Sequence, residues 1–231
     1  MATEKLHKSG PRILMGILLS IAVGGCSRQL PAGEHNNFHP YGIEHVALHF
    51  EYFGAIRGSE DIYIDSFGTR EVHVVNSALI TPQGFEPTIT YTMRDRGKIV
   101  VVDSIRRLEA KMIDRTMDSI YHLVPTDVPA PQAVLRDIYG PQAYTLAGDT
   151  TVLGLPAHIW RHSGIPGFLL VWRGIIVGDR ATIQGQVKEL RLMSFDTTTP
   201  INSSIFTPPS GFPIHDFTNP ESGQPPPPMN P

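Results

Sequence analysis

Four histidines between residues 35 and 49 have types and spacing that could support metal chemistry: His35, His39, His45 and His49. On a helix, two histidines four residues apart can bind one zinc ion. Residues 45–52 instead alternate apolar and polar side chains, which predicts a strand with His45 and His49 roughly 13 Å apart. Zinc needs both nitrogens at about 2 Å. We therefore expect no metal site here and assign His35 and His39 to a polar linker.

Asp61 and Asp65 are likewise too far apart on one strand to act as a catalytic carboxylate pair. Paired carboxylates of glycosidases lie about 5 to 9.5 Å apart, whereas two residues four apart on a strand are separated by roughly 13 Å. His158 and His162 flank Trp160 on what reads as one strand face. The chain contains no Gly-x-Ser-x-Gly, His-Glu-x-x-His or Walker-type sequence. We expect no catalytic residue and no cofactor, although residues distant in sequence could still meet.

Alternation with a period of two predicts the strands that position these side chains. It is clearest in residues 45–52, 61–65, 70–77, 88–93 and 99–102, and it returns in 145–146, 158–162, 168–177 and 186–195. Asp95-Arg96-Gly97 has the composition of a hairpin turn, because glycine accepts a positive φ. Further hairpin breaks are predicted at Phe67-Gly68-Thr69, at residues 164–167 and at Gly178-Asp179-Arg180.

The middle of the chain is open to two interpretations. Residues 104–113 could be a strand, because Leu108, Ala110 and Met112 alternate, or they could begin a helix. We favour a strand followed by a helix from about 114 to 122. A second helix is predicted between Pro131 and Gly140, which suit a first helical turn and a C-cap. These elements predict an α+β fold: one strongly curved antiparallel sheet, a half-barrel, with two short helices on its concave side.

Apolar side chains on the predicted strands could line the concave face of such a sheet. Methionine and aromatic residues adapt to varied apolar shapes, so this set is the candidate ligand-binding surface: Phe50, Tyr52, Ile62, Ile64, Ile89, Tyr91, Met93, Leu170 and Trp172. The same residues could instead pack only against the helices.

The single cysteine, Cys26, follows a basic start and a short apolar run from Ile13 to Val23. This order is typical of an export signal, and the run is too short to span a membrane, which needs about 20 apolar residues. The small residues before Cys26 resemble the bacterial lipobox. That resemblance implies cleavage before Cys26 and a lipid on its sulfur and amino group. Ser27 in the next position points to the outer membrane.

Composition divides the chain into four parts: a signal peptide (1–25), a lipidated N-terminus and tether (26–41), a folded domain (42–215) and a proline-rich tail (216–231). Loss of the signal peptide removes Lys5, Lys8, Arg12 and Glu4 and takes the net charge from −3 to −5. A mildly acidic chain offers no basic field for nucleic acid. Two or more lipid chains anchor a protein stably, so the membrane is the expected partner.

Several segments of the domain resemble those of small exported bacterial proteins. They are residues 151–160, Val171-Trp172-Arg173-Gly174-Ile175, residues 205–212 and residues 54–68 with Asp61-Ile62-Tyr63-Ile64-Asp65. These proteins resemble in architecture the periplasmic lipoprotein carrier and the outer-membrane lipoprotein receptor, in which a half-barrel closes over an apolar cavity. The resemblance implies the fold more than an activity.

We expect a non-enzymatic, lipid-anchored envelope protein that holds or passes an acyl chain or another apolar ligand. The alternative is a structural or interaction lipoprotein whose core is completely filled. An envelope hydrolase is a third hypothesis, and it requires polar groups that converge in a cleft. The solvent-accessible volume of the concavity separates the first two, because a ligand site needs roughly 300 Å³ or more.

Overall fold

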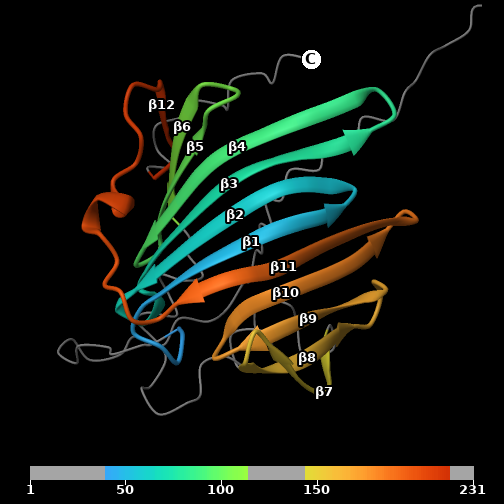
Figure 1. Ribbon diagram of the computed structural model, residues 1–231. Helices are drawn as coiled ribbons and strands as arrows, with labels where there is room; N and C mark the ends of the chain where they lie inside the picture. Colours follow the sequence, from blue (N-terminus) through green and yellow to red (C-terminus); the bar gives the residue numbers. More distant parts are fainter. Residues whose placement is uncertain (1–39, 114–143, 219–231) are drawn as a thin grey trace, which may run out of the picture.

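The computed structural model describes residues 40–113 and 144–218, which form one open sheet. Its strand order is β12-β6-β5-β4-β3-β2-β1-β11-β10-β9-β8-β7. Neighbouring strands are antiparallel wherever their register is defined, except that β12 runs parallel to β6. The sheet twists and curls along its length, with β7 to β9 at one flank and β5, β6 and β12 at the other (Figure 1).

The strands of the first half are β1 (Val46–Gly54), β2 (Ile56–Asp65), β3 (Arg70–Thr81), β4 (Gly84–Asp95), β5 (Lys98–Asp103) and β6 (Leu108–Ile113). Those of the second half are β7 (Tyr144–Val152), β8 (Leu155–His162), β9 (Gly167–Trp172), β10 (Ile175–Ile183), β11 (Gln186–Asp196) and β12 (Ile214–Asp216). Two 3₁₀ turns complete the described elements, η1 (Ser66–Gly68) and η2 (Ser203–Phe206). Residues 104–113 therefore contain a strand, β6, as favoured from the sequence.

The hairpin predicted at Gly178-Asp179-Arg180 is wrong, because these residues lie inside β10. The chain turns instead at Arg173-Gly174, where both residues have positive φ (49° and 88°). Two consecutive positive φ angles match the right-handed twist of the flanking strands. Gly178 has a packing role: a Cβ on it would lie 3.0 Å from a methyl carbon of Leu170.

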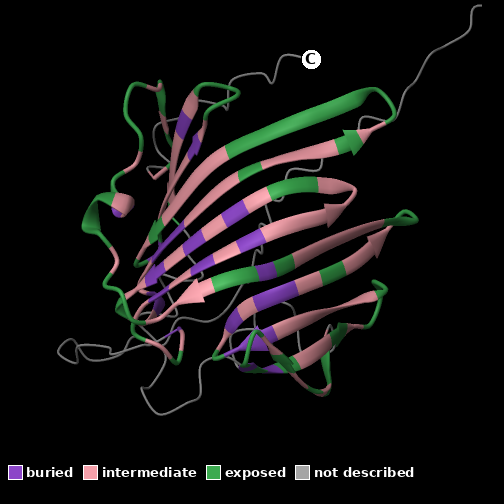
Figure 2. Ribbon diagram, in the orientation of Figure 1, coloured by how far each residue is buried: buried purple, intermediate pink, exposed green. Residues whose placement is uncertain are grey.

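The main core joins strands that are distant in the strand order. Its buried residues are Val46, Leu48, Phe50, Ile62, Ile64, Leu155, Ala157, Trp172, Ile175, Val177 and Leu192. In the strand order, β1, β11, β10 and β9 separate β2 from β8. Figure 2 shows these buried positions gathered on β1, β2 and the β8–β10 flank. The main core therefore extends along one face of the sheet from β2 to β8.

The opposite face has a smaller core of its own. Val72 and Val102 are fully buried there, and Phe206 of η2 is 7% exposed. Val72 is paired with Met93 and Val102 with Tyr91, so both valines lie on the same face of the sheet. The segment after β11 runs along the strand ends to β12 (Figure 1) and carries Phe206 with it. The guanidinium of Arg70 lies 4.1 Å from the centre of the Phe206 ring.

The predicted α+β class is contradicted. The described residues are nearly all β and place no α-helix on the concave side of the sheet. The helices predicted for 114–122 and 131–140 lie outside the described residues, as do the signal peptide, most of the tether and most of the tail. Nor does any helical segment within 40–113 and 144–218 reach the length and hydropathy that crossing a membrane requires.

Candidate functional site

The residues predicted to line an apolar ligand surface do not share one face of the sheet. Four of them belong to the main core: Phe50, Ile62, Ile64 and Trp172. Leu170 packs against that core. Phe50 and Ile64 are 0% exposed, so neither side chain offers a free surface to a ligand. These residues belong to the core that stabilises the sheet.

Three further predicted residues lie on the other face: Ile89, Tyr91 and Met93. The cross-strand row that begins at Phe50 passes through β2 and β3 and reaches β4 at Thr90. Cross-strand partners point to the same side, and side chains alternate along a strand, so the neighbours of Thr90 point away from Phe50. The Tyr91 hydroxyl donates to the carbonyl of Ile205 at 2.6 Å. Ile89 remains 40% exposed.

Tyr52, the ninth predicted residue, leads into a polar network on the core face. Its hydroxyl donates to the carboxylate of Glu60. The Nδ1 of His73 is 2.6 Å from Glu60, and its Nε2 is 2.7 Å from Glu71. The Tyr41 hydroxyl lies 3.3 Å from both oxygens of Glu71. We call these five residues the His73 network.

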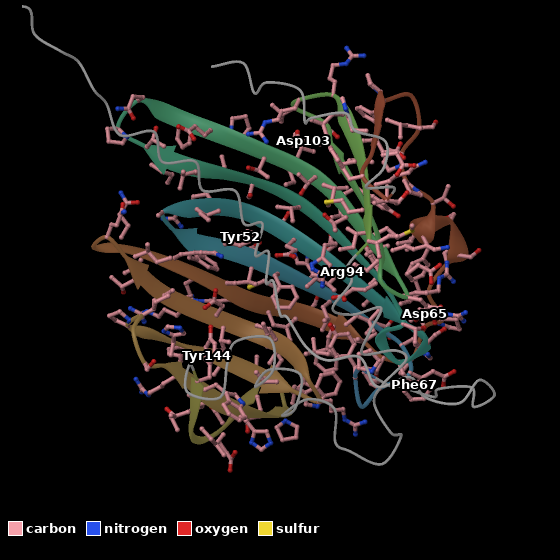
Figure 3. The ribbon with its side chains drawn as sticks, turned by 180° about the vertical axis from the view of Figure 1, so that it is seen from behind. Tyr52, Asp65, Phe67, Arg94, Asp103 and Tyr144 are labelled. Atoms are coloured by element: carbon pink, nitrogen blue, oxygen red, sulfur yellow. The ribbon has the colours of Figure 1, made fainter. Side chains whose placement is uncertain are left out.

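The network spans several strands at the centre of the sheet. Tyr52 comes from β1, Glu60 from β2, and Glu71 and His73 from β3. Arg94 of β4 extends it, with Nη1 3.9 Å from Glu71. Figure 3 labels Tyr52 and Arg94 on the sheet as seen from behind. Three neighbouring strands are thus joined by side-chain bonds as well as by their backbones.

Burial makes the charges of this network strongly interdependent. The side chains of Glu60 and Glu71 are 10% and 9% exposed, and that of His73 is 24% exposed. Burial opposes the charge of His73, but the charge of Glu71 and the bonds to both carboxylates raise its pKa to about 9. Burial likewise opposes the carboxylate charges, and His73 more than offsets it, so the pKa values of Glu60 and Glu71 are lowered.

This geometry restricts what His73 can do chemically. Each ring nitrogen faces a carboxylate and carries a proton, so His73 is an imidazolium with no free lone pair. It cannot accept a proton or bind a metal ion in this state. Burial, and then the charge of Glu60, raise the pKa of Tyr52 well above its usual range, so this hydroxyl stays protonated and donating. The network is therefore structural: the imidazolium of His73 lies between the carboxylates of Glu60 and Glu71.

A second set of contacts fixes the chain where the predicted tether meets the domain. The Tyr41 N–H donates to Phe67 and the Gly42 N–H to Arg173, both at 3.0 Å. The guanidinium of Arg173 donates back to the Gly42 carbonyl at 2.7 Å. A Cβ on Gly68 would lie 2.3 Å from the Tyr41 ring. We call this group of five residues the tether clamp.

The face of the sheet opposite the main core carries a histidine–aspartate pair that was not predicted from the sequence. His49 Nδ1 is 2.7 Å from Asp61, with side chains 41% and 38% exposed. On the other side of His49, the residue directly opposite in β11 is Ser194. These are the residue types of a hydrolytic triad, but within the described residues no hydrogen bond joins His49 to Ser194. His158 and Asp149 form a similar pair at 2.6 Å.

The remaining candidates from the sequence are placed separately. Asp65 lies 3.6 Å from Arg70 and is not grouped with Asp61. In the part of the chain that the structure describes, no three histidine, aspartate or glutamate side chains are grouped to hold a metal ion. Cys26 is outside the described residues, so its lipidation stays a prediction.

The His73 network was not predicted, although the sequence contains one indication of it. Glu60 precedes Ile62 and Ile64 with the same alternation, which assigns a charged side chain to an apolar face. A buried carboxylate needs a partner. The partner could not be identified, because His73 joins Glu60 only through the register of β2 and β3.

Comparisons with known proteins give little beyond general similarity. No protein-family model matches the chain, and no curated protein matches it. An uncharacterised conserved protein of Thermus thermophilus is 10% identical, with 79% of this chain and 93% of that one covered and a TM-score of 0.45. LprF from Mycobacterium bovis is 10% identical, with coverage of 73% and 92% and a TM-score of 0.33.

A structure of the Pseudomonas aeruginosa MucA/MucB complex contains a chain that is 14% identical, with 74% of this chain and 58% of that one covered and a TM-score of 0.38. The similarity therefore spans little more than half of that chain. All three TM-scores are below 0.5, so no argument about this protein rests on them.

Proposed function

We propose that this chain is a lipid-anchored protein of the bacterial envelope that acts by interacting with other molecules through its surface, without catalysis. The lipobox-like sequence before Cys26 supports the anchor, and Ser27 supports the outer membrane as its location. The described domain supplies a rigid open sheet, held by the main core and by the His73 network. The proposed role is to present that sheet at the membrane.

The observation that carries this proposal is that the residues expected to line a cavity are divided between the core and the opposite face of the sheet. Four of the nine residues expected to line a cavity are buried in the core, and Phe50 and Ile64 are 0% exposed. A pocket of about 250 Å³ lies over the turn formed by residues 161–167, away from the core. The division of the predicted lining residues between two faces supports the interaction hypothesis over an acyl carrier.

Carriage of an acyl chain or another apolar ligand is the second candidate. It is supported by Ile89, which is 40% exposed and stands in line with the partly buried Tyr91 and Met93 on β4. Native mass spectrometry after mild extraction distinguishes the two candidates. The interaction hypothesis predicts empty protein and no binding of a fluorescent fatty acid. A bound lipid that is lost on Met93→Asp would establish the carrier instead.

The absence of catalysis is tested at the one serine that lies beside a histidine–aspartate pair. A fluorophosphonate probe should leave Ser194 unlabelled, because no bond to His49 activates its hydroxyl. Labelling at Ser194 that disappears in His49→Gln, and persists in the matched variant His158→Gln, would contradict the proposal and favour a hydrolase.

The anchor is tested by metabolic labelling with palmitate in an expressing bacterium. Cys26→Ala should abolish the label and leave an unprocessed precursor, whereas Ser27→Ala should keep it. Undiminished labelling of Cys26→Ala would overturn the assignment.

A further inference from the structure

The end of the sheet where the tether enters is one continuous surface made of three turns. The Arg96 N–H donates to Thr69 at 2.9 Å, which joins the β4–β5 turn to the residue that follows η1. The tether clamp joins η1 and the β9–β10 turn through Tyr41 and Gly42. We call this surface the tether end: residues 40–44, 65–70, 94–98 and 173–174.

The tether end carries exposed cations, and most of its carboxylates contact other groups of the domain. Arg96, Lys98 and Arg173 are exposed, and none of them forms an ion pair within the described residues. Asp65 is paired with Arg70, and Glu71 belongs to the His73 network. Glu44 and the half-buried Asp95 are the remaining acids. Positive charge is thus in excess here, although the mature chain as a whole is acidic.

The opposite end of the long strands has a different character. The β3–β4 hairpin extends beyond its neighbours, and its tip carries the cross-strand pair Ile80 and Phe85, which are 37% and 73% exposed. The β1–β2, β3–β4 and β10–β11 turns lie together at the right of Figure 1, away from η1. The two ends of the sheet therefore differ in apolar exposure.

The tether keeps the domain close to its membrane. Fifteen peptide steps separate Cys26 from Tyr41, and at roughly 3.5 Å each they span no more than about 50 Å. Within that distance, attraction to anionic headgroups acts on a domain that cannot diffuse away. Each exposed Lys or Arg near such a surface adds a favourable contribution. A small charge asymmetry is then sufficient to select an orientation.

We propose that the tether end faces the anionic lipid headgroups of the membrane that holds Cys26, and that Arg96 and Lys98 contact them. The hairpin tips then point away from the membrane, which leaves Ile80 and Phe85 at the distal end. This inference rests on the proposed lipid anchor, and it adds an orientation that the anchor alone does not impose.

The experiment uses the lipidated mature chain reconstituted in vesicles of phosphatidylethanolamine with or without phosphatidylglycerol. Because Cys26 is the only cysteine and is blocked by lipid, one introduced cysteine takes one fluorophore. Ser66→Cys reports on the tether end and Gln83→Cys on the distal end. Nitroxide lipids labelled at the headgroup quench whichever fluorophore is closer to the membrane.

The proposal predicts at least about fivefold stronger quenching at position 66 than at position 83 in anionic vesicles, and a smaller ratio at high salt. Arg96→Glu with Lys98→Glu should reduce the ratio to near one. The matched pair Arg57→Glu and Arg161→Glu, at exposed sites away from the tether end, should not. Equal quenching at the two positions, or a ratio that the first pair leaves unchanged, would overturn the orientation.

Flotation of the vesicles separates this outcome from failure of the anchor. Protein that floats with zwitterionic vesicles but shows no preferred end contradicts the orientation and leaves the anchor intact. Protein that does not float with any vesicle contradicts the lipid anchor, and the orientation with it.

Discussion

His73 is the residue on which the buried charges of this sheet depend. It lies between Glu60 and Glu71, which are both buried, and it is the one cation among the described residues that pairs with both. Removal of one member of a buried ion pair costs more than the pair contributes, because the remaining charge loses its partner. Here two carboxylates would lose the cation between them, and Glu71 would keep only Arg94 at 3.9 Å.

Replacement of His73 should therefore destabilise the fold far more than replacement of an exposed histidine. We expect His73→Leu to lower the free energy of unfolding by about 3 kcal/mol or more. The matched variant His49→Leu removes an exposed pair and should cost less than about 1 kcal/mol. Urea unfolding of the mature chain measures both. Equal losses would mean that the His73 network contributes no more than a surface ion pair.

The same network predicts how stability depends on pH. The pKa of His73 is raised to about 9, so its contribution is complete below its ordinary pKa near 6.5 and is lost as the pH rises through 9. The pKa values of Glu60 and Glu71 are lowered, so their contribution is present above about 4.5 and is lost on acidification.

Thermal unfolding should therefore show a stability maximum between about pH 4.5 and 6.5, with a decline toward pH 9 that disappears in His73→Leu. A wild-type profile that stays flat from pH 6 to 10 would contradict the assigned charge state of His73.

Gly68 and Gly154 have the same φ, so substitutions there distinguish the cost of backbone strain from the cost of a steric contact. Gly68 and Gly154 both have φ of +88°, but a Cβ at Gly154 meets nothing within 4 Å, whereas at Gly68 it overlaps Tyr41. Gly154→Ala should cost about 1 kcal/mol from the angle alone. Gly68→Ala should cost clearly more, and Tyr41→Ala should relieve the excess in the double variant. Equal costs in urea unfolding would contradict the tether clamp.

At the scale of elements, alternation located most strands, and the reason for the errors is the register between strands. Along β4, alternation correctly grouped Ile89, Tyr91 and Met93, and along β1 it grouped Phe50 with Tyr52. Whether two groups share a face depends on the turns between them, because a shift of one residue reverses every side chain. Across three hairpins, the sequence does not determine whether two groups of side chains lie on the same face of the sheet.

Short or irregular elements were beyond prediction for a related reason. β12 has three residues, too few to show a period, and it pairs with β6 from far along the chain. The hairpin break was misplaced because Gly178 was interpreted as a turn residue. It is a close-packing residue beneath Leu170, and a single glycine has the same appearance in both roles.

Pro87 lies on β4, in the part of the β3–β4 hairpin that extends beyond its neighbours and could pair with a strand of another chain. The carbonyl of Ile89 accepts from Ser104 on the β5 side, so the backbone of Pro87, two residues earlier, faces the same unpaired side within the described residues. Proline has no N–H to offer an incoming strand. Pro87→Thr should therefore promote self-association that depends on concentration, measured by sedimentation. Glu86→Thr, whose backbone faces β3, should remain as the wild type.

At the scale of the whole molecule, the protein is an open sheet, and we propose that a lipid tether holds its charged end at a membrane. The residues of the main core are buried and stabilise the sheet. The His73 network and the tether clamp meet at Tyr41 and connect the centre of the sheet to residues 40–42. The apolar side chains that stay exposed include Ile80 and Phe85 at the hairpin tip and Ile89 on β4.

The central claim is that Cys26 holds this sheet to a membrane. Its most direct test is mass spectrometry of the N-terminal peptide of protein isolated from the bacterial envelope. We predict a mature chain that begins at Cys26, with a diacylglyceryl group on the sulfur and an acyl group on the amine. A chain that begins at any other residue, or a Cys26 with a free thiol, would contradict the account.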